Sequence, residues 1–292
     1  SIREIIDKIV FSYEKFFLNL NSYDYLNFKK KVKLMNVLIG DIGNTITKIC
    51  IIEINSFKIM KTTFFTTNKI SSINFLKKGL EKFLKKNNMH KVALFSSVVP
   101  RSKAMLGAFL KMKYAIKLKE IKDKNIKKII KINIKDKNQV GSDRIANAVG
   151  VYKLYKSNCI VLDFGTATTF DVVTKNGIYN GGIIAPGINL SLKSLVSSAD
   201  QIPAFSIIKQ KKIIGKNTVE ALRSGFYWGY SGLINNIILK IEKETKKKYK
   251  IIFTGGYADL FKKSIRRSFT VDRNITIKGI IEIFKENKEQ LK

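Results

Sequence analysis

The feature that most constrains this fold is a hairpin pattern that occurs twice in the chain. The stretches "VLIGDIGNTITK" at residues 37–48 and "CIVLDFGTATTF" at residues 159–170 both read as an apolar strand, an aspartate, an apolar residue, a glycine, a small polar residue and a returning strand. One such turn alone would be weak evidence, because Asp and Gly populate turns for conformational reasons. Two of them predict two related lobes, each presenting an Asp-x-Gly turn to a shared cleft.

The rest of the chain mixes strand and helix patterns, which predicts an α/β fold. Strands are expected at 37–42, 46–54 and 91–99, and the apolar spacing over 71–87 predicts a helix. A second helix is expected after Pro100, and a third is expected to begin at Ser142 or Asp143, followed by strands at 159–164 and 168–173. The segment 251–260 is predicted as a strand that runs into Gly255 and Gly256 and then a helix.

Composition indicates an ordered protein, since the 292 residues are 45% hydrophobic and include only three prolines. The net charge of +33 is of the kind that attracts phosphates, so nucleic-acid binding is one alternative. The lysines are nevertheless spread along every segment beside abundant Ile and Asn, a bias that an A/T-rich genome imposes on any protein. We therefore expect no specific nucleic-acid partner.

Few residues are available for metal or triad chemistry of the common kinds. Cys50 and Cys159 lie in strand-like runs far from any second cysteine, which predicts reduced core thiols, and His90 is the only histidine. Residues 1–35 contain no apolar stretch long enough to span a bilayer and no cleavage site, so we expect an extension of unknown role, no membrane partner and a cytoplasmic protein.

The composition of the two turns favours phosphate binding. Gly43 and Gly165 allow the backbone to approach a ligand, and N–H groups in both turns can donate to phosphate oxygens. A carboxylate beside a phosphate is repulsive unless a cation separates them, so Asp41 and Asp163 imply metal ions, with Mg²⁺ on the nucleotide phosphates as the first candidate. The stretch "GKNT" at 215–218 lacks the Walker A pattern, so the site is not a P-loop.

Motifs across the chain carry a family resemblance. They are "DIGNTITK" (41–48), "GSDRIANAV" (141–149), "DFGTATTFD" (163–171), "GGIIAPGI" (181–188), "GKNTVEALRSG" (215–225) and "TGGYADL" (254–260). In this order and spacing the chain resembles the type III pantothenate kinases, members of the acetate and sugar kinase, Hsp70 and actin superfamily. The resemblance implies duplicated ribonuclease-H-like (actin-like ATPase) lobes at 36–145 and 146–292, with a nucleotide cleft between them.

The resemblance also implies an activity and a set of site residues. The reaction is ATP-dependent phosphorylation of pantothenate to 4′-phosphopantothenate, the first step of coenzyme A biosynthesis, with Asp143 as the catalytic base. The implied ATP-binding residues are Asp41, Ile42, Gly43, Asn44, Thr45, Ile46, Thr47, Lys48 and Thr166. The implied substrate-binding residues are Gly141, Ser142, Asp143, Arg144 and Thr218.

The same resemblance implies cations and an oligomer. Asp163 binds a monovalent cation, K⁺ or NH₄⁺, and Asp41 holds Mg²⁺ through the nucleotide phosphates. Family members are homodimers with substrate pockets near the subunit interface. The chain has Ile134 and Lys137 where many members have a tyrosine and a proline, and the loss of the tyrosine bears on pantothenate affinity more than on the fold.

Several residues have simpler interpretations. Asp143 is also the residue type of a plain helix N-cap, and Asn217 with Glu220 resembles a capping box that makes Thr218 the start of a helix. Asp171 is expected to serve the strand edge, and Lys48 is also compatible with a solvated strand position.

Rival functions remain beside pantothenate phosphorylation. One is a non-catalytic accessory or regulatory protein that keeps the kinase-like fold, and its sequence sign would be loss of the base, whereas Asp143 is present. Another is a kinase of the same superfamily that acts on a different small alcohol. A nucleic-acid-binding protein would show a steep salt dependence instead of phosphate transfer.

Overall fold

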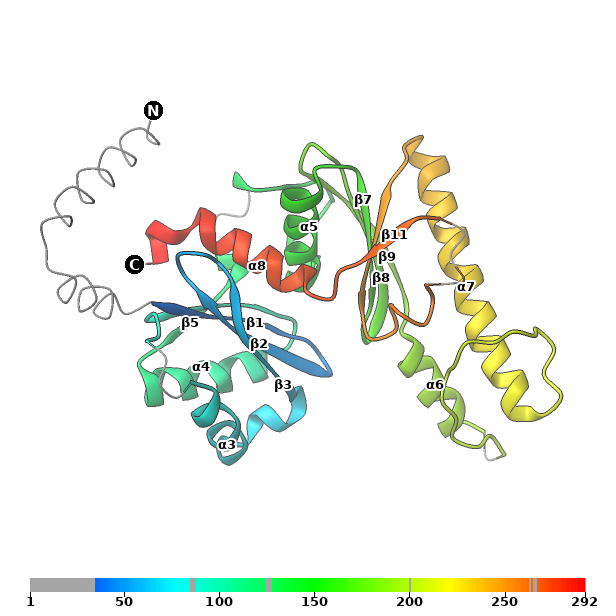
Figure 1. Ribbon diagram of the computed structural model, residues 1–292, viewed down its shortest axis with the longest axis horizontal. Helices are drawn as coiled ribbons and strands as arrows, with labels where there is room; N and C mark the ends of the chain where they lie inside the picture. Colours follow the sequence, from blue (N-terminus) through cyan, green and yellow to red (C-terminus); the bar gives the residue numbers. More distant parts are fainter. Residues whose placement is uncertain are drawn as a thin grey trace, which may run out of the picture.

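The computed structural model describes residues 35–84, 88–123, 128–199, 201–262, 264 and 267–291. Two mixed β-sheets lie side by side, each with its own outer helices (Figure 1). Helices α5 (Ser142–Tyr155) and α8 (Ile275–Glu286) pack between them. We call the sheet of β1 to β5 with its outer helices the first lobe, and the sheet of β6 to β11 with its outer helices the second lobe.

The first sheet has the strand order β3-β2-β1-β4-β5. Its strands are β1 (Asn36–Ile42), β2 (Ile46–Glu53), β3 (Ile59–Thr66), β4 (Val92–Ser97) and β5 (Lys117–Glu120). The outer face is covered by α3 (Ile73–Leu84) and α4 (Pro100–Tyr114), with η1 (Thr67–Ser71) leading into α3. The predicted strands and helix are confirmed here, although residues 85–87 of that prediction lie outside the described residues.

The second sheet repeats this topology. Its order is β11-β10-β7-β8-β9-β6, so that both sheets contain an antiparallel hairpin whose first strand has a parallel neighbour on its other side. The strands are β6 (Lys131–Ile132), β7 (Cys159–Phe164), β8 (Ala167–Val173), β9 (Ile178–Pro186), β10 (Lys250–Gly255) and β11 (Phe269–Val271). The duplicated fold predicted from the two hairpins is confirmed.

The outer side of the second sheet is covered by the long helix α7 (Thr218–Thr245), with α6 (Ile188–Ser197) beside its first half (Figure 1). Short 3₁₀ turns complete the described chain at η2 (Ile121–Asp123), η4 (Lys137–Gln139) and η5 (Lys288–Leu291). The helix predicted after Gly256 is wrong, because residues 256–262 form consecutive turns.

Alternating side chains of the strands divide the core into layers. Val37 and Ile39 of β1 face α5 and α8, whereas Leu38 and Ile42 face α3 and α4. Strand β7 divides in the same way, with Cys159 facing α5 and α8. One apolar cluster therefore joins the inner faces of both sheets, as expected when two sheets bury the faces that they turn toward each other against helices packed between them.

Both cysteines are buried free thiols in this inner cluster, as the sequence predicts. Helices α5 and α8 cross there at two glycines. A Cβ built on Gly279 would lie 1.8 Å from the Ala146 carbonyl oxygen, and one on Gly150 would lie 2.7 Å from the Ile275 carbonyl oxygen. The close helix crossing therefore depends on the missing side chains.

Two elements bear on the division between the lobes. Strand β6 precedes residue 146 in the chain but pairs with β9 of the second sheet, and α8, near the end of the chain, packs on β1 and β4 of the first. The division into 36–145 and 146–292 stays a prediction. The 1–35 extension lies outside the described residues except for its last residue.

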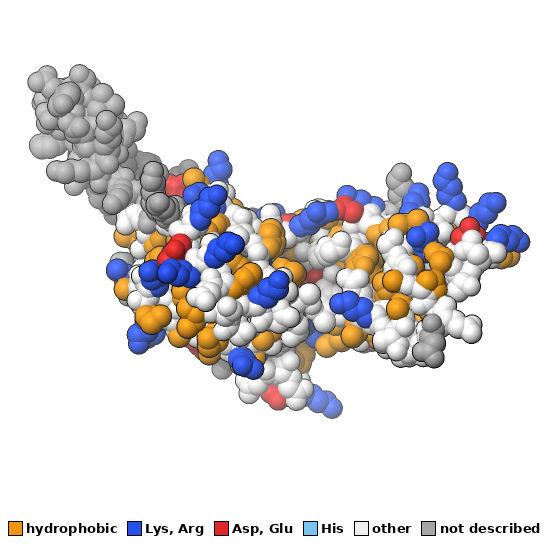
Figure 2. Space-filling view, turned by 90° about the horizontal axis from the view of Figure 1, so that it is seen from below, with side chains coloured by type: hydrophobic (Ala, Val, Ile, Leu, Met, Phe, Trp, Pro, Cys, Tyr) orange, Lys and Arg blue, Asp and Glu red, His pale blue; other side chains and the backbone are white. Residues whose placement is uncertain are grey.

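Two surface properties follow from the described residues. None of their helices is long and apolar enough to cross a bilayer. On the face seen in Figure 2, lysine and arginine side chains are scattered among apolar and uncharged groups. That face gives no support to the nucleic-acid alternative, which requires basic residues gathered into a patch.

Candidate active site

The two Asp-x-Gly turns meet where the lobes join. Thr45 Oγ1 in the first turn lies 3.0 Å from Thr166 Oγ1 in the second, although 121 residues separate them in the chain. Asp41 lies at the end of β1 opposite Lys48, and Asp163 lies at the end of β7 opposite Thr169. The fold therefore brings both copies of the sequence pattern to one place.

Asp41 is a partly buried carboxylate held from one side. The Ser96 hydroxyl, on the neighbouring strand β4, donates a hydrogen bond to Asp41 Oδ1. Burial raises the pKa of Asp41 to about 7; Asp143 and Asp163 act in the same direction, and Ser96 and Lys48 oppose it. A proton or a cation therefore relieves a strong electrostatic penalty at this position.

Asp163 occupies the equivalent position of the second lobe with different neighbours. The Asn147 side-chain amide of α5 donates from Nδ2 to Asp163 Oδ2 at 3.4 Å. The Thr276 hydroxyl of α8 donates to Asn147 Oδ1 at 2.7 Å. Burial and then the charge of Asp143 raise the pKa of Asp163 to about 6. Both inner helices thus help to orient this carboxylate.

Asp143 lies at the start of α5, where its charge acts on the carboxylates of both turns. The N-cap of α5 is Gly141 and the helix begins at Ser142, so the interpretation of Asp143 as a plain N-cap is wrong. Burial raises the pKa of Asp143, and its charge contributes to the raised pKa values of Asp41 and Asp163. Asp143 Oδ1 accepts a hydrogen bond from the Arg144 backbone N–H at 2.8 Å, which leaves Oδ2 for another partner.

Ser142 anchors this helix start to the first lobe. Its hydroxyl donates to the Ser97 carbonyl oxygen at 2.7 Å and accepts from the Ser97 N–H at 2.9 Å. The side chain is buried and its hydroxyl is used by the end of β4. In this arrangement Ser142 fixes where Asp143 lies relative to the first sheet.

Arg144 turns toward the second sheet. Its Nε donates to Asp171 Oδ1 at 2.7 Å, and the Tyr179 hydroxyl donates to the same oxygen at 2.9 Å. Burial raises the pKa of Asp171 to about 7, although Arg144 and Tyr179 lower it. Asp171 therefore does more than close a strand edge, because it is the ionic partner of a predicted substrate-binding residue.

Lys48 reaches across the lobe junction. Its ammonium group donates to Asn274 Oδ1 and to the Arg273 carbonyl oxygen, the latter at 3.3 Å, and lies 5.6 Å from the centre of the Phe64 ring. Burial lowers the pKa of Lys48, and the nearby Asp41 opposes that shift. Lys48 is therefore half-buried and hydrogen-bonded instead of fully solvated, and its role in binding phosphate stays a prediction.

The other predicted ATP-binding residues divide by exposure. Asn44, Thr45 and Ile46 form the exposed tip of the first turn, and Gly43 closes it by donating its N–H to the Ile46 carbonyl oxygen at 3.1 Å. Ile42 and Thr47 are buried, and the Thr47 hydroxyl lies 2.9 Å from that of Thr67. The exposed tip can reach a ligand directly, whereas the buried pair supports the turn.

Gly255 and Gly256 have separate structural roles. Gly255 has φ +84°, and a Cβ there would lie 2.6 Å from the backbone of Phe164, next to Asp163. Gly256 donates its N–H to the Phe164 carbonyl oxygen at 3.1 Å, and a Cβ on Gly256 would meet nothing within 4 Å. The first glycine is required by the close packing against the second turn, and the second leaves open space.

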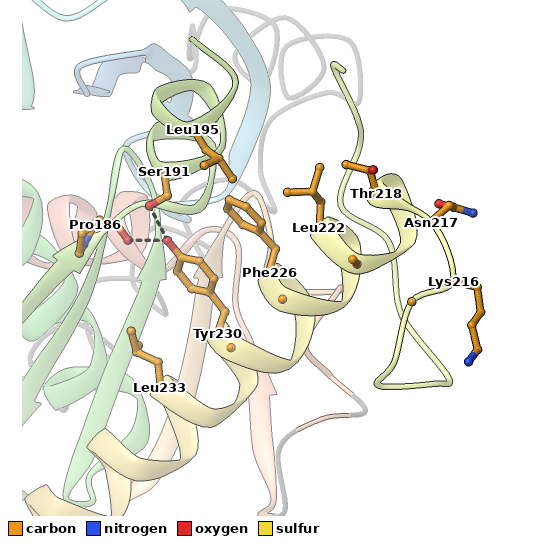
Figure 3. Close-up of a pocket in the computed structure, with 14 residues that line it drawn as sticks. Pro186, Ser191, Leu195, Lys216, Asn217, Thr218, Leu222, Phe226, Tyr230 and Leu233 are labelled. Carbon is orange, nitrogen blue, oxygen red and sulfur yellow. Dashed lines mark hydrogen bonds between the residues drawn. The ribbon is translucent and has the colours of Figure 1, made fainter. Parts of the chain in front are cut away.

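Thr218 lies on a separate apolar groove. It is the first residue of α7, after the N-cap Asn217, whose side chain accepts from the Glu220 N–H at 2.9 Å, while Glu220 accepts from the Lys216 N–H at 2.8 Å. The predicted capping arrangement is therefore present. The groove is about 970 Å³ in volume, and its lining includes Thr218, Leu222, Phe226 and Tyr230 of α7 with Ser191 and Leu195 at α6 (Figure 3).

The groove is apolar and does not include the carboxylates. Tyr230 connects the two walls of the groove, because its hydroxyl lies 2.8 Å from Ser191 Oγ and 3.2 Å from the Pro186 carbonyl oxygen (Figure 3). Asp41, Asp143 and Asp163 are not among its lining residues. Within one chain, Thr218 and the carboxylates thus belong to different surfaces.

The carboxylates fit cation sites that are completed by a ligand. Among the described residues, no group of three or more His, Cys, Asp and Glu side chains is close enough to hold a metal by itself. Asp41 and Asp163 each have one oxygen engaged by a neighbour and one left over. Mg²⁺ is commonly bound by one or two carboxylates plus phosphates and water, so this donor set fits it beside a nucleotide.

The supporting residues of the site could not be identified from the sequence. Ser96, Asn147 and Asp171 each contact a predicted site residue from another part of the chain, and Tyr179 contacts Asp171. The one available signal was the aspartate that ends the "DFGTATTFD" motif. It alternates with apolar residues along β8 and is therefore placed on the face toward α5.

Comparisons with known proteins agree with this geometry. A family model described as type III pantothenate kinase matches residues 37–240. A type III pantothenate kinase of Pelagibacter ubique is 48% identical over 245 residues, which cover 84% of this chain and 97% of that protein. One of Paramagnetospirillum magneticum is 38% identical over 195 residues, covering 67% of this chain and 75% of that protein.

A solved structure is similar in fold. A protein named as a Baf family transcriptional activator, from Campylobacter jejuni, superimposes with a TM-score of 0.56 at 21% identity. The match covers 87% of this chain and all of that protein. At this identity the likeness supports the two-lobed fold alone.

Proposed function

The chain belongs to the type III pantothenate kinase family, and from this premise we propose how its residues perform the reaction. The enzyme transfers the terminal phosphoryl group of ATP to an alcohol group of pantothenate and gives 4′-phosphopantothenate, in coenzyme A biosynthesis. The accessory-protein alternative is not favoured, because the two relatives, which this chain matches over 97% and 75% of their length, are both named as type III pantothenate kinases. One observation carries the residue roles: the two turns meet at Thr45 and Thr166, 3.0 Å apart, and Ser142 anchors the start of α5, and with it Asp143, to the end of β4.

We assign Asp143 to the acceptor hydroxyl of pantothenate. Asp143 Oδ2, free of the backbone contact, accepts a hydrogen bond from the primary hydroxyl and aligns its oxygen with the γ-phosphorus. The new O–P bond forms as the bond from phosphorus to the β,γ-bridging oxygen breaks, and the hydroxyl proton passes to Asp143. Phosphoryl transfer has a loose transition state, so alignment contributes more than base strength.

The exposed tip of the first turn is assigned to the nucleotide phosphates. Asn44, Thr45 and Ile46 are exposed residues whose backbone N–H groups would be available to phosphate, and Thr166 lies opposite. Phosphate oxygens entering between the turns would replace the hydroxyl contact between Thr45 and Thr166. Backbone N–H groups in such a turn make an anion-binding concavity without any charged side chain.

Two cations are assigned to the two aspartates. Asp41 would hold Mg²⁺ against the phosphates, and Asp163 would hold the monovalent cation. When bound, these cations neutralise the phosphate charge that develops during transfer. The protein's own contribution is to keep both carboxylates oriented, through Ser96 on one side and Asn147 on the other.

Arg144 is assigned to pantothenate, which is an acid. The Nη2 atom of Arg144 is buried without a hydrogen-bond partner in the described structure. A buried donor of this kind costs free energy until an acceptor arrives, so an anionic group of the substrate gains by pairing with it. Gly141 and Ser142 would line the same pocket chiefly through their backbone.

A homodimer is proposed from the groove on α6 and α7. Its lining is mostly apolar, and the exposed Leu195 and Trp228 lie on the same two helices. A second copy that covers this groove would bury its apolar side chains and bring Thr218 to an interface. Light scattering on the purified protein tests this, since a monomer at micromolar concentration contradicts it.

The reaction is tested by a coupled assay of ADP release. The purified protein is supplied with Mg²⁺-ATP, with and without pantothenate, in potassium and then in sodium buffer. Release that requires both pantothenate and potassium supports the reaction and the cation assignment together. Release that ignores pantothenate contradicts the substrate, and equal rates in both buffers contradict the monovalent cation.

A further inference from the structure

The guanidinium group of Arg144 lies in a cradle on the inner face of the second sheet. Asp171 on β8 accepts from Arg144 Nε at 2.7 Å, and Tyr179 on β9 donates to the same carboxylate oxygen at 2.9 Å. The side chain of Asp171 has no exposed surface and that of Arg144 is 14% exposed. A carboxylate buried this deeply costs folding free energy unless it is paired, so the pair is unlike an ordinary surface ion pair.

The third side of the cradle is formed by Gly182, whose lack of a side chain leaves room for the guanidinium group. Gly182 on β9 lies directly opposite Asp171, where the pairing of the two strands is irregular. A Cβ built on Gly182 would lie 2.6 Å from Arg144 Nη2 and 1.9 Å from the Phe170 carbonyl oxygen. The guanidinium therefore occupies space that any other residue at 182 would fill.

The ion pair is incomplete in a specific way. Arg144 and a carboxylate can form two parallel hydrogen bonds, but here only the bond from Nε is made. Arg144 Nη2 and Asp171 Oδ2 are both buried and lack partners in the described structure. A pair whose sole task was stability would gain by closing this second bond, because each unpaired buried group is costly.

We propose that Asp171 is a positioning residue for pantothenate binding, and that it acts through Arg144. Its single hydrogen bond fixes the guanidinium plane, Tyr179 fixes the carboxylate, and Gly182 provides the space, so that the remaining N–H groups of Arg144 are presented to the substrate. The inference rests on the proposed function, since it requires Arg144 to contact pantothenate.

The test compares Michaelis constants of Asp171→Asn and the wild type. Asparagine keeps the shape of the side chain and removes its charge. We expect the KM for pantothenate to rise at least about tenfold and the KM for ATP to stay within about twofold, because only the Arg144 side of the site is disturbed. A change of kcat alone, or an equal rise of both KM values, overturns the proposal.

Glu242→Gln is the matched control. Glu242 on α7 is another carboxylate with a side chain only 6% exposed; it pairs with Arg267 and Lys248 and is not among the residues assigned to the site. Both variants are expected to lower Tm, but only Asp171→Asn should change the KM for pantothenate. If Glu242→Gln raises that KM equally, the effect is one of general stability and the proposal fails.

A double-mutant cycle shows whether Asp171 acts through Arg144. In an Arg144→Gln background, adding Asp171→Asn should leave the KM for pantothenate unchanged within about twofold, because the group to be positioned is gone. Additive effects overturn the proposal. Tyr179→Phe provides the milder variant if Asp171→Asn does not fold; it should raise the same KM by a few-fold, and no rise counts against the proposal.

Failure of the inference is distinct from failure of the proposed function. A wild-type protein that does not phosphorylate pantothenate contradicts the function itself. A wild-type protein that does so, with an Asp171→Asn variant of unchanged KM for pantothenate, contradicts only the role of Asp171.

Discussion

The two Asp-x-Gly turns share a backbone design and differ in what surrounds the carboxylate. Asp41 receives a hydroxyl from Ser96 and faces Lys48 across the hairpin, whereas Asp163 receives an amide from Asn147 and faces Thr169. A lysine lowers the pKa of Asp41, and no cationic side chain has a comparable effect on Asp163. The turn thus decides where each carboxylate lies, and the neighbouring side chains decide its hydrogen bonds and the charges around it.

The walls of the turns differ in the same way. The first turn is braced by hydroxyl groups, since Thr67 Oγ1 donates to the Gly43 carbonyl oxygen at 2.7 Å. The second is enclosed by backbone: a Cβ on Gly187 would lie 2.0 Å from the Thr166 carbonyl oxygen, and one on Gly255 would lie 2.6 Å from the Phe164 backbone. Duplication therefore preserved the hairpin while each lobe acquired its own supporting contacts.

The largest expected effect belongs to Asp143, which lies outside both turns and acts on the carboxylates of both. Asp143→Asn should lower kcat by about 10²–10⁴-fold, because the amide cannot accept the hydroxyl proton. The fold and the turns should stay intact, which circular dichroism and nucleotide binding can verify. Near-normal turnover in a folded variant removes Asp143 from the mechanism.

Exchanging the two turn carboxylates for amides should separate their roles. Asp41→Asn is expected to raise the Mg²⁺ concentration needed for half-maximal activity by at least about 10-fold, and Asp163→Asn to do the same for K⁺, because loss of even an outer-shell partner costs about 10–100-fold at other metal sites. Each variant should leave the other cation's requirement within about threefold. Both variants shifting both requirements equally would mean that the turns form one undivided cation site.

The pH dependence of stability should also separate the two turns. The folded pKa values of Asp41, about 7, and Asp163, about 6, lie above the ordinary value of 3.8. Each group therefore adds stability at low pH that is lost as pH rises through its folded pKa. We expect Tm of the wild type to fall relative to Asp163→Asn as pH rises to about 6, and relative to Asp41→Asn as pH rises to about 7.

Potassium provides the control for that experiment. A cation bound at Asp163 competes with the proton, so added K⁺ should raise Tm above the folded pKa of Asp163, about 6, and have little effect well below it. Sodium at the same ionic strength controls for screening. A Tm that does not respond to potassium at any pH contradicts a monovalent site in the second turn.

The smallest expected effect comes from making the first hairpin resemble the second. Lys48→Thr places at this position the residue that faces Asp163, and it removes the contact with Asn274 across the lobes. We expect the KM for ATP to rise by about 2–5-fold, since a partly exposed charge contributes little. The pKa of Asp41 should rise further, and a loss of activity beyond tenfold would mean that Lys48 contacts the phosphates.

Local pattern was enough to predict the duplicated fold. The apolar strand, aspartate and glycine recur in both hairpins, and the matching strand order of the two sheets confirms their relation. The start of α5 at Ser142 was also predictable, although the N-cap is Gly141 and not Asp143. A Gly-Ser-Asp sequence offers more than one capping residue, and tertiary contacts of Ser142 with Ser97 decide between them.

What could not be predicted depends on contacts between distant segments. The pairing of Arg144 with Asp171 requires α5 to pack on β8, and the bond from Asn147 to Asp163 requires α5 to pack on β7. The helix expected after Gly256 failed for a related reason. Gly255 is held at positive φ by its packing on Phe164, and the chain continues in turns despite the helix-compatible residues that follow.

The central claim is that equivalent turns hold two different cations, and anomalous diffraction tests it most directly. Crystals grown with a non-hydrolysable ATP analogue, Mn²⁺ in place of Mg²⁺ and Tl⁺ in place of K⁺ would give separate anomalous peaks for the two metals. We predict a manganese peak between Asp41 and the phosphates and a thallium peak at Asp163. Thallium at Asp41, or manganese at both aspartates, would contradict it.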